Sequence, residues 1–166
     1  MTNHLEDAKT IKLDRMRYAK NTFSSRLTYL AILFDVLYFV SIYESDVGSW
    51  YYQILIGASI VYNLVFMLVA FLASEGVKNY KASYAWVLLA AGIGQIARIF
   101  ILPMQAYKAT VTISKITYPV MEKSQLILVI AFLCLSALCC FVAGVVGIHR
   151  SHVLAAYNAK LNEKSA

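Results

Sequence analysis

Four long runs of apolar residues, separated by short polar stretches, limit what this chain can fold into more than any other feature. They cover residues 27–43, 50–73, 84–102 and 126–148, the first being the shortest. The hydrocarbon core of a bilayer is about 30 Å thick, and a helix of about 20 apolar residues spans it. Soluble domains are roughly 45–50% apolar, whereas this chain is 60% hydrophobic. The sequence therefore predicts an all-α integral membrane protein, a single antiparallel bundle of four transmembrane helices.

The formal net charge of +6 would suit a nucleic-acid partner, but the basic residues are placed as in a membrane topology. Six lysines and arginines precede the first run, two lie between the second and third runs, and three follow the fourth, whereas the loop 103–124 has three. Short loops rich in basic residues remain in the cytoplasm. We therefore expect both termini to be cytoplasmic, in the plasma or inner membrane of the cell. The expected partners are the lipid bilayer and its anionic headgroups, not nucleic acid.

The polar segments at the two ends of the chain, 1–26 and 149–166, are both candidates for helix. The apolar residues of the first have loosely helical spacing, which leaves two interpretations: an interfacial helix on the inner membrane surface, or a frayed tail. In the second, Val153, Tyr157 and Leu161 recur every four residues. This spacing predicts a cytoplasmic extension of the fourth helix.

The loops between the runs carry two local signals. In the outer loop 103–124, Val111 and Ile113 alternate with threonines, which is a strand pattern. A strand has unpaired edges, so the segment would pair with a partner chain, fold over the bundle, or form an irregular loop; we expect the irregular loop. In the inner loop, Gly76 is the expected C-cap of the second helix.

Two charged residues lie inside the apolar runs, and three polar residues lie at similar depths. At 1.5 Å per residue, Asp35 is about 13 Å from either end of its helix and Arg98 about 7 Å from the outer end of its own. Ionisable residues at such depths face the interior of a bundle or a wet cavity. If the helix faces meet, one polar cluster forms from Asp35, Tyr38, Asn63, Gln95 and Arg98.

Three interpretations of this cluster remain. In the first, Arg98 neutralises Asp35 and the pair fixes the register of the bundle. In the second, Arg98 reaches the interface alone and Asp35 is protonated. In the third, the cluster lines a path for a proton, an ion or a small polar solute.

Small residues recur at helical spacing in two of the runs, which predicts close approach of another helix in the same chain or in a second one. The two stripes are Ala90, Gly94 and Ala97 in the third run, and Ser136, Cys140, Gly144 and Gly147 in the fourth. The first overlaps a G-x-G-x-x-A match at 92–97. A dinucleotide fingerprint requires a preceding strand, so we interpret this match as helix packing.

The remaining reactive residues do not form a recognisable catalytic motif. The three cysteines, Cys134, Cys139 and Cys140, lie deep in the fourth run without C-x-x-C spacing. His149 and His152 have no nearby carboxylate apart from Glu163. We therefore expect neither an enzyme nor a cofactor or metal site.

Two functions fit these features. The first is a small non-catalytic membrane protein that acts by helix packing, as an accessory or structural subunit of a larger membrane (transport) complex or as a homo-oligomer. The alternative is a small oligomeric transporter or channel that uses the intramembrane polar cluster.

Overall fold

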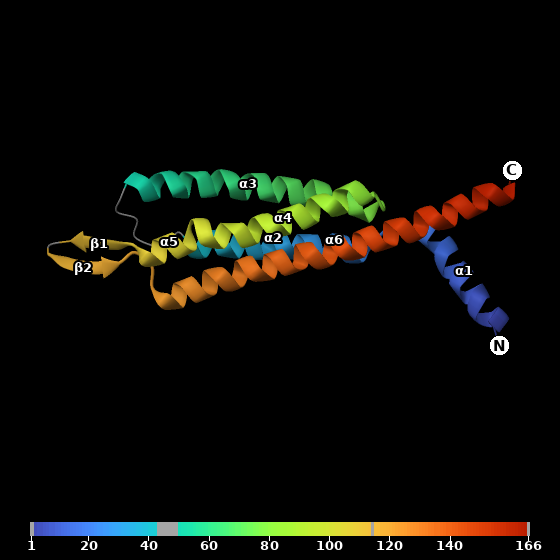
Figure 1. Cartoon of the computed structure of the whole chain (residues 1–166), viewed down its shortest axis with the longest axis horizontal. Helices are drawn as coiled ribbons and strands as arrows, with labels where there is room; N and C mark the ends of the chain where they lie inside the picture. Colours follow the sequence, from blue (N-terminus) through green and yellow to red (C-terminus); the bar gives the residue numbers. More distant parts are fainter. Residues whose placement is uncertain (1, 43–49, 114, 166) are drawn as a thin grey trace.

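The computed structural model describes residues 2–42, 50–113 and 115–165 (Figure 1). Its elements are α1 (Thr2–Tyr18), α2 (Thr22–Ile42), α3 (Trp50–Lys78), α4 (Ala82–Ile101), α5 (Pro103–Lys108), β1 (Thr110–Ile113), β2 (Ile116–Pro119) and α6 (Lys123–Ser165). Four helices are long and apolar enough to cross a membrane: α2, α3, α4 continued by α5, and α6. This confirms a helical chain with the makeup of a multi-pass membrane protein. The first outer loop, 44–49, where Glu44, Asp46 and Gly48 predict a tight turn, lies outside the described residues.

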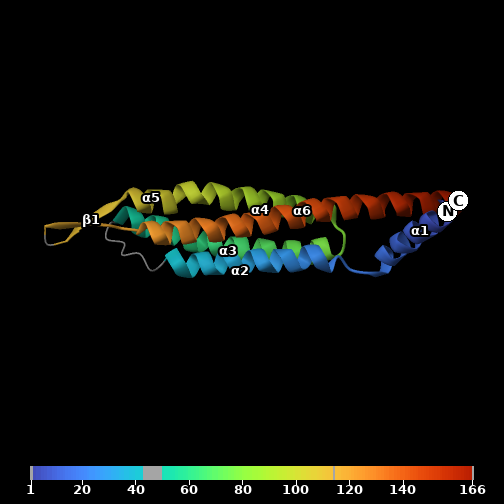
Figure 2. The same cartoon turned by 90° about the horizontal axis from the view of Figure 1, so that it is seen from below.

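The four long helices lie lengthwise side by side (Figures 1 and 2). α2 and α4 each pack against both α3 and α6, so α2 and α4 occupy opposite corners of the bundle. Side chains from α2 and α4 can therefore meet across its centre. The β1–β2 hairpin projects from one end of the bundle, hereafter the hairpin end, while α1 and the last turns of α6 project from the other, the termini end.

The interior changes in character along the bundle. Near the hairpin end it contains large side chains such as Tyr38, Leu102 and Met121. Near the termini end it contains mainly small or β-branched residues, among them Ala73, Val77 and Ala85. Small residues let helix backbones approach closely. The outward faces keep many exposed large apolar side chains, as expected for helices that contact lipid.

The turn between α3 and α4 places a tyrosine in the left-handed backbone region. Tyr80 has φ 57°. Its N–H donates to the carbonyl of Val77 at 3.1 Å, and the N–H of Lys81 donates to the carbonyl of Gly76 at 3.1 Å. This is the Schellman pattern, in which the position held here by Tyr80 is usually glycine.

The expectation that Gly76 caps the second helix is wrong. The helix continues to Lys78, and the cap position falls on Tyr80. Gly76 instead lies against the ring of Tyr84, which would overlap a Cβ at this position. The glycine is required here for a close approach of α4 and not for a turn.

Replacing Tyr80 with glycine is expected to raise the free energy of unfolding by roughly 1 kcal/mol, because a left-handed backbone strains residues that carry a Cβ. Reversible unfolding in mixed micelles measures the change. Tyr157→Gly, in the helical interior of α6, is the matched control and should destabilise by up to about 1 kcal/mol. A loss of stability in Tyr80→Gly would show that the ring contributes more than the backbone strain removes.

The outer loop forms a β-hairpin, so the expected irregular loop is wrong. β1 and β2 pair antiparallel, with Thr110 opposite Pro119 and Ile113 opposite Ile116. Lys115, with φ 72°, occupies the turn. The strand pattern was thus real, and its partner is the next segment of the same loop. Each strand still has one outer edge in this two-stranded sheet.

Where the structure describes them, both end segments are helical apart from residues 19–21. Residues 2–18 form α1, the helical alternative of the two considered for the N-terminal segment. α6 runs without a break to Ser165 and passes well beyond the fourth apolar run. The position of α1 on a membrane surface remains a prediction.

Candidate functional site

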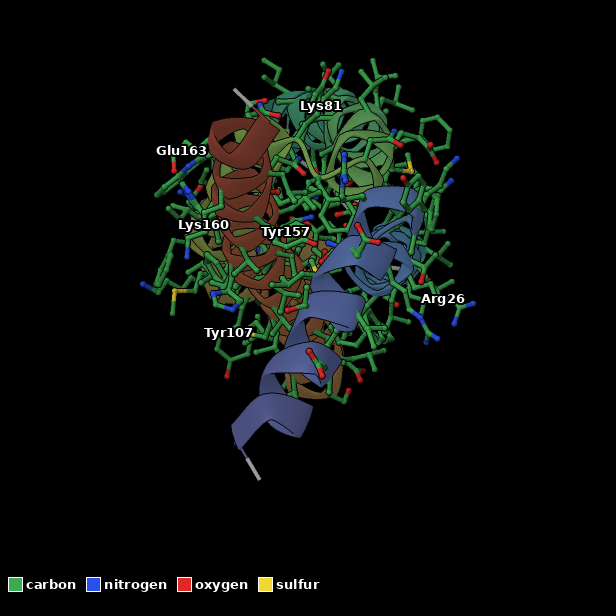
Figure 3. The ribbon with its side chains drawn as sticks, turned by 90° about the vertical axis from the view of Figure 1, so that its right-hand side faces the viewer. Arg26, Lys81, Tyr107, Tyr157, Lys160 and Glu163 are labelled. Carbon is green, nitrogen blue, oxygen red and sulfur yellow. The ribbon has the colours of Figure 1, made fainter. Side chains whose placement is uncertain are left out.

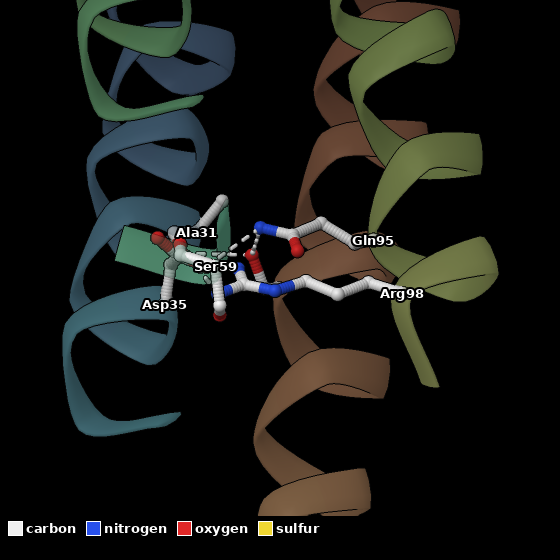
Figure 4. Close-up of polar contacts among 6 residues, drawn as sticks. Ala31, Asp35, Ser59, Gln95 and Arg98 are labelled. Carbon is white, nitrogen blue, oxygen red and sulfur yellow. Dashed lines mark hydrogen bonds and ion pairs between the residues drawn. The ribbon is translucent and has the colours of Figure 1, made fainter. Parts of the chain in front are cut away.

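An ion pair crosses the centre of the bundle from α2 to α4. Nη1 of Arg98 lies 3.0 Å from Oδ1 of Asp35, and the two side chains are 5% and 0% exposed. Figure 4 shows Arg98 extended from α4 across the core toward Asp35. Within a low-dielectric interior, each charge requires the other, because an unpaired buried ion is strongly unfavourable.

The guanidinium of Arg98 is enclosed on its other sides by α2 and α3. Its Nη2 donates to Oγ of Ser59 at 2.8 Å and lies 3.4 Å from the carbonyl oxygen of the same residue. The rings of Tyr38 and Tyr62 lie 4.1 and 4.8 Å from the guanidinium carbon, measured to the ring centroids. Aromatic faces attract a guanidinium most when it is desolvated. Arg98 is therefore held by three helices.

Gln95 connects this pair to the fourth helix. Its Nε2 donates to Oδ1 of Asp35 at 2.9 Å and to Oγ of Ser136 at 3.4 Å. Ser136 in turn donates to the carbonyl of Ala31 at 2.9 Å. Figure 4 shows Gln95 beside Arg98, both directed toward α2. One polar layer thus links α2, α3, α4 and α6.

The structure brings together four of the five residues of the predicted cluster: Asp35, Tyr38, Gln95 and Arg98. Asn63 is also buried, at 1% exposed, but its amide has no hydrogen-bond partner among the described residues. Sequence reasoning missed three members, Ser59, Tyr62 and Ser136. Ser59 lies one helical turn from Asn63, so the shared helix face could have predicted that Ser59 belongs to the cluster.

Not every polar atom of the layer is satisfied. In the described part of the chain, Oδ2 of Asp35, Oε1 of Gln95 and Nε of Arg98 are buried without a hydrogen-bond partner. A buried polar group left in this way costs about 1–3 kcal/mol. Such atoms are places where a water or a polar solute would bind. The layer is therefore a cross-link that retains some capacity for hydrogen bonding.

A cavity of about 260 Å³ between α3 and α4 borders this layer. Its lining includes Ser59, Tyr62 and Arg98, and the small residues Ala58, Gly94 and Ala97. The polar side chains that line the cavity, Ser59, Tyr62 and Arg98, belong to the buried ion pair or contact it, and the other lining residues are apolar. This cavity thus reaches an intramembrane charge.

Among the described residues, the small-residue stripe of the third run makes a close helix contact only at Gly94, against α3. Ala90 is exposed and Ala97 lines the cavity. Gly94 alone makes room for a neighbour, since a Cβ there would lie 2.5 Å from the hydroxyl of Tyr62. The glycine of α4 that meets α6 is Gly92, where a Cβ would lie 3.0 Å from the ring of Phe141.

All four residues of the stripe in the fourth run are buried at helix contacts. Ser136 bonds to the backbone of α2, and Cys140 packs in the middle of the bundle. A Cβ on Gly144 would lie 3.0 Å from the carbonyl oxygen of Ala85, and Gly147 lies against Ala85 as well. α6 therefore approaches α4 closely near the termini end.

Other candidate chemistry is not assembled in the described residues. They contain no group of three or more His, Cys, Asp and Glu side chains that could hold a metal ion. Cys139 and Cys140 are buried and Cys134 is exposed, and all three are free thiols. The polar layer is thus the one intramembrane site that the described geometry offers for a function.

In comparisons with known proteins, no family model, curated protein or solved structure matches this chain.

Proposed function

We propose that this chain is a small non-catalytic membrane protein that acts by helix packing. It serves as an accessory or structural subunit of a larger membrane (transport) complex, or assembles with copies of itself. The observation that carries the proposal is the enclosure of Arg98, which is 4% exposed and engaged by Asp35, Ser59 and two tyrosine rings. A charge held in this way fixes the helices relative to one another.

The extramembrane parts suit a protein that binds partners. The hairpin extends beyond one end of the bundle and α6 beyond the other (Figure 1). The outer edges of a two-stranded sheet are ready to pair with another strand, and Ile116 and Tyr118 on β2 are 56% and 50% exposed. A rigid bundle with a projection at each end would hold a partner from both sides of the membrane.

The distribution of basic residues supports a cytoplasmic termini end. Lys20, Lys78, Lys81 and Arg150 all lie where the apolar helices begin or end on that side. Lys108, Lys115 and Lys123 lie at the hairpin end. By the positive-inside rule, the hairpin lies outside a cell membrane and both termini inside.

Native mass spectrometry of the tagged protein, extracted gently from its own membrane, tests the proposal. We expect a complex of fixed stoichiometry, either with a larger membrane protein or between copies of this chain. A second sample carrying a deletion of 110–119 removes the hairpin and should weaken that complex while leaving the bundle folded. A monomer that carries lipid alone would contradict the proposal.

The second candidate is a small oligomeric transporter or channel. It is favoured by the unsatisfied atoms of Asp35, Gln95 and Arg98 and by the cavity that reaches Arg98. The two candidates separate in proteoliposomes. A transporter loses proton or ion flux in the charge-neutral pair Asp35→Asn with Arg98→Gln, although the pair remains folded. If the protein is a packing subunit, the parent protein shows no proton or ion flux in proteoliposomes and the double variant does not change this result.

A further inference from the structure

A larger cavity, of about 630 Å³, lies at the termini end between α1, α6 and the α3–α4 turn. Figure 3 views the molecule from this end, with α1 and the end of α6 nearest the viewer. Met16 on α1 and Val153 on α6 contribute apolar walls, and Tyr80 lines it from the turn. The cavity is separate from the intramembrane cluster and shares no residue with it.

The charged residues that line this cavity are all cationic. Lys12 lies on α1, Lys20 precedes α2, and Arg150 lies on α6 beside His149. No aspartate or glutamate is among the described residues that line it. Cations that line one cavity with no carboxylate in its lining favour an anion there, because Lys and Arg donate charge-assisted hydrogen bonds to phosphate oxygens.

Two nearby carboxylates among the described residues are bonded mainly to basic residues outside the cavity. Glu75, one turn before the end of α3, accepts a hydrogen bond from Lys78 at 2.8 Å and another from Tyr29. Asp14 on α1 lies 3.6 Å from Arg17. Each of these acids has a basic partner outside the cavity, and Glu75 also interacts electrostatically with Lys20, so it offsets part of the charge of that lysine.

Arg150 is held in place by its neighbours. Its Nη1 donates to Oδ1 of Asn21 at 2.8 Å, and its guanidinium lies 5.8 Å from the centre of the Phe23 ring. A guanidinium fixed in this way is preorganised, so binding an anion orders fewer side-chain rotamers.

The cavity lies at the depth where the apolar helices end. α2 begins at Thr22, and the N–H of Asn21 donates to the carbonyl of Lys78, the last residue of α3, at 2.9 Å. Lys20 and Tyr80 flank this junction in sequence and line the cavity. In a bilayer the polar headgroup region begins where the hydrocarbon core ends. In a bilayer that covers the apolar helices, Lys20 and Arg150 would therefore lie near the level of the lipid phosphates.

Tyr80 adds an independent observation. It keeps a left-handed backbone, with φ 57°, at a position where glycine would be unstrained. Strained residues persist where their side chains serve a site, and the ring of Tyr80 lines this cavity. An aromatic ring with a hydroxyl suits the boundary between acyl chain and headgroup.

We propose that this cavity binds the phosphate of an anionic phospholipid, with Lys12, Lys20 and Arg150 around the phosphate and the apolar walls against the first part of an acyl chain. The shared chemistry is a phosphate group, which an inorganic phosphate ion could also supply. The site is independent of whether the protein is a subunit or a transporter.

Binding of phosphatidylglycerol, phosphatidylcholine and inorganic phosphate to the purified full-length protein in neutral detergent tests this site. Native mass spectrometry across a titration gives an apparent Kd for each probe. The variant Lys12→Gln with Lys20→Gln should bind phosphatidylglycerol about 30-fold more weakly, taking roughly fivefold for each lysine near the surface. The matched control is Arg15→Gln with Lys160→Gln, which removes the same charge from α1 and α6 outside the cavity and should change the Kd by less than about threefold.

A third variant, Ala19→Phe, fills the cavity without changing charge and should also weaken binding. Preference for phosphatidylglycerol over phosphatidylcholine, lost in both cavity variants and kept in the control, supports the proposal. Equal weakening in the cavity and control pairs would show diffuse surface attraction and overturn it. Binding of inorganic phosphate that depends on the two lysines, with no such dependence for the lipid, would overturn the lipid assignment and leave a soluble phosphate as the ligand.

Discussion

Replacing Arg98 with glutamine is expected to lower the free energy of unfolding by about 3–5 kcal/mol, the range for removing one partner of a buried ion pair. The substitution leaves the carboxylate of Asp35 at 0% exposed with Gln95 as its remaining donor on Oδ1. It also removes the contacts of the guanidinium with Ser59 and with two tyrosine rings. Equilibrium unfolding in mixed micelles, followed by circular dichroism, measures the change.

The double variant, Asp35→Asn with Arg98→Gln, distinguishes a coupled ion pair from an arginine that does not depend on Asp35. Asp35→Asn alone should also destabilise, because it leaves Arg98 buried without a counter-charge. The two changes together should recover about 2 kcal/mol relative to the sum of the single effects, within the range that double-mutant cycles give for residues in contact. Arg26→Gln, an exposed cation on the same helix as Asp35, should stay within about 0.5 kcal/mol of the parent. Additive single effects would refute a coupled pair.

The charged pair was predictable from the sequence because the membrane leaves so few arrangements for it. Asp35 is too deep to reach water, so its face had to turn inward, and Arg98 was the one cation within reach. The partners on α3 were harder to predict. Ser59 shares a helix face with Asn63, which was a usable signal, whereas Tyr62 lies in an otherwise apolar run and its contact with Arg98 depends on the exact rotation of α3 about its axis.

Two other differences between the sequence-based predictions and the structure also have local causes. In α4, small residues occupy several faces, so spacing alone could not decide between Gly94, which meets Tyr62, and Gly92, which meets α6. The hairpin was missed because its turn has no Asn-Gly or Asp-Gly pair, which is the strongest short-range signal for one. Its pairing depends on Ile116 and the residues after it as much as on Val111 and Ile113.

Replacing Gly144 with leucine is expected to destabilise the bundle by about 2–3 kcal/mol, the upper part of the usual range for overpacking. A Cβ on Gly144 would lie 2.7 Å from Cδ2 of Leu89 and 3.0 Å from the carbonyl oxygen of Ala85. The side chain of Leu89 on α4 can rotate away from the added atoms, but the backbone carbonyl of Ala85 cannot. Gly144→Ala should therefore have a smaller effect, of about 1 kcal/mol. Unfolding in mixed micelles measures the series.

The same substitution at Gly57 is the control, because a Cβ there meets nothing within 4 Å. Gly57→Leu should be neutral or stabilise by up to about 1 kcal/mol, since leucine favours helix over glycine. If the two leucine variants unfold alike, α6 and α4 do not approach as closely as described. If only the Gly144 variant loosens the bundle, its effect should extend to the Asp35–Arg98 layer, because Ser136 and Gly144 lie on the same face of α6 and both fix its distance from the rest of the bundle.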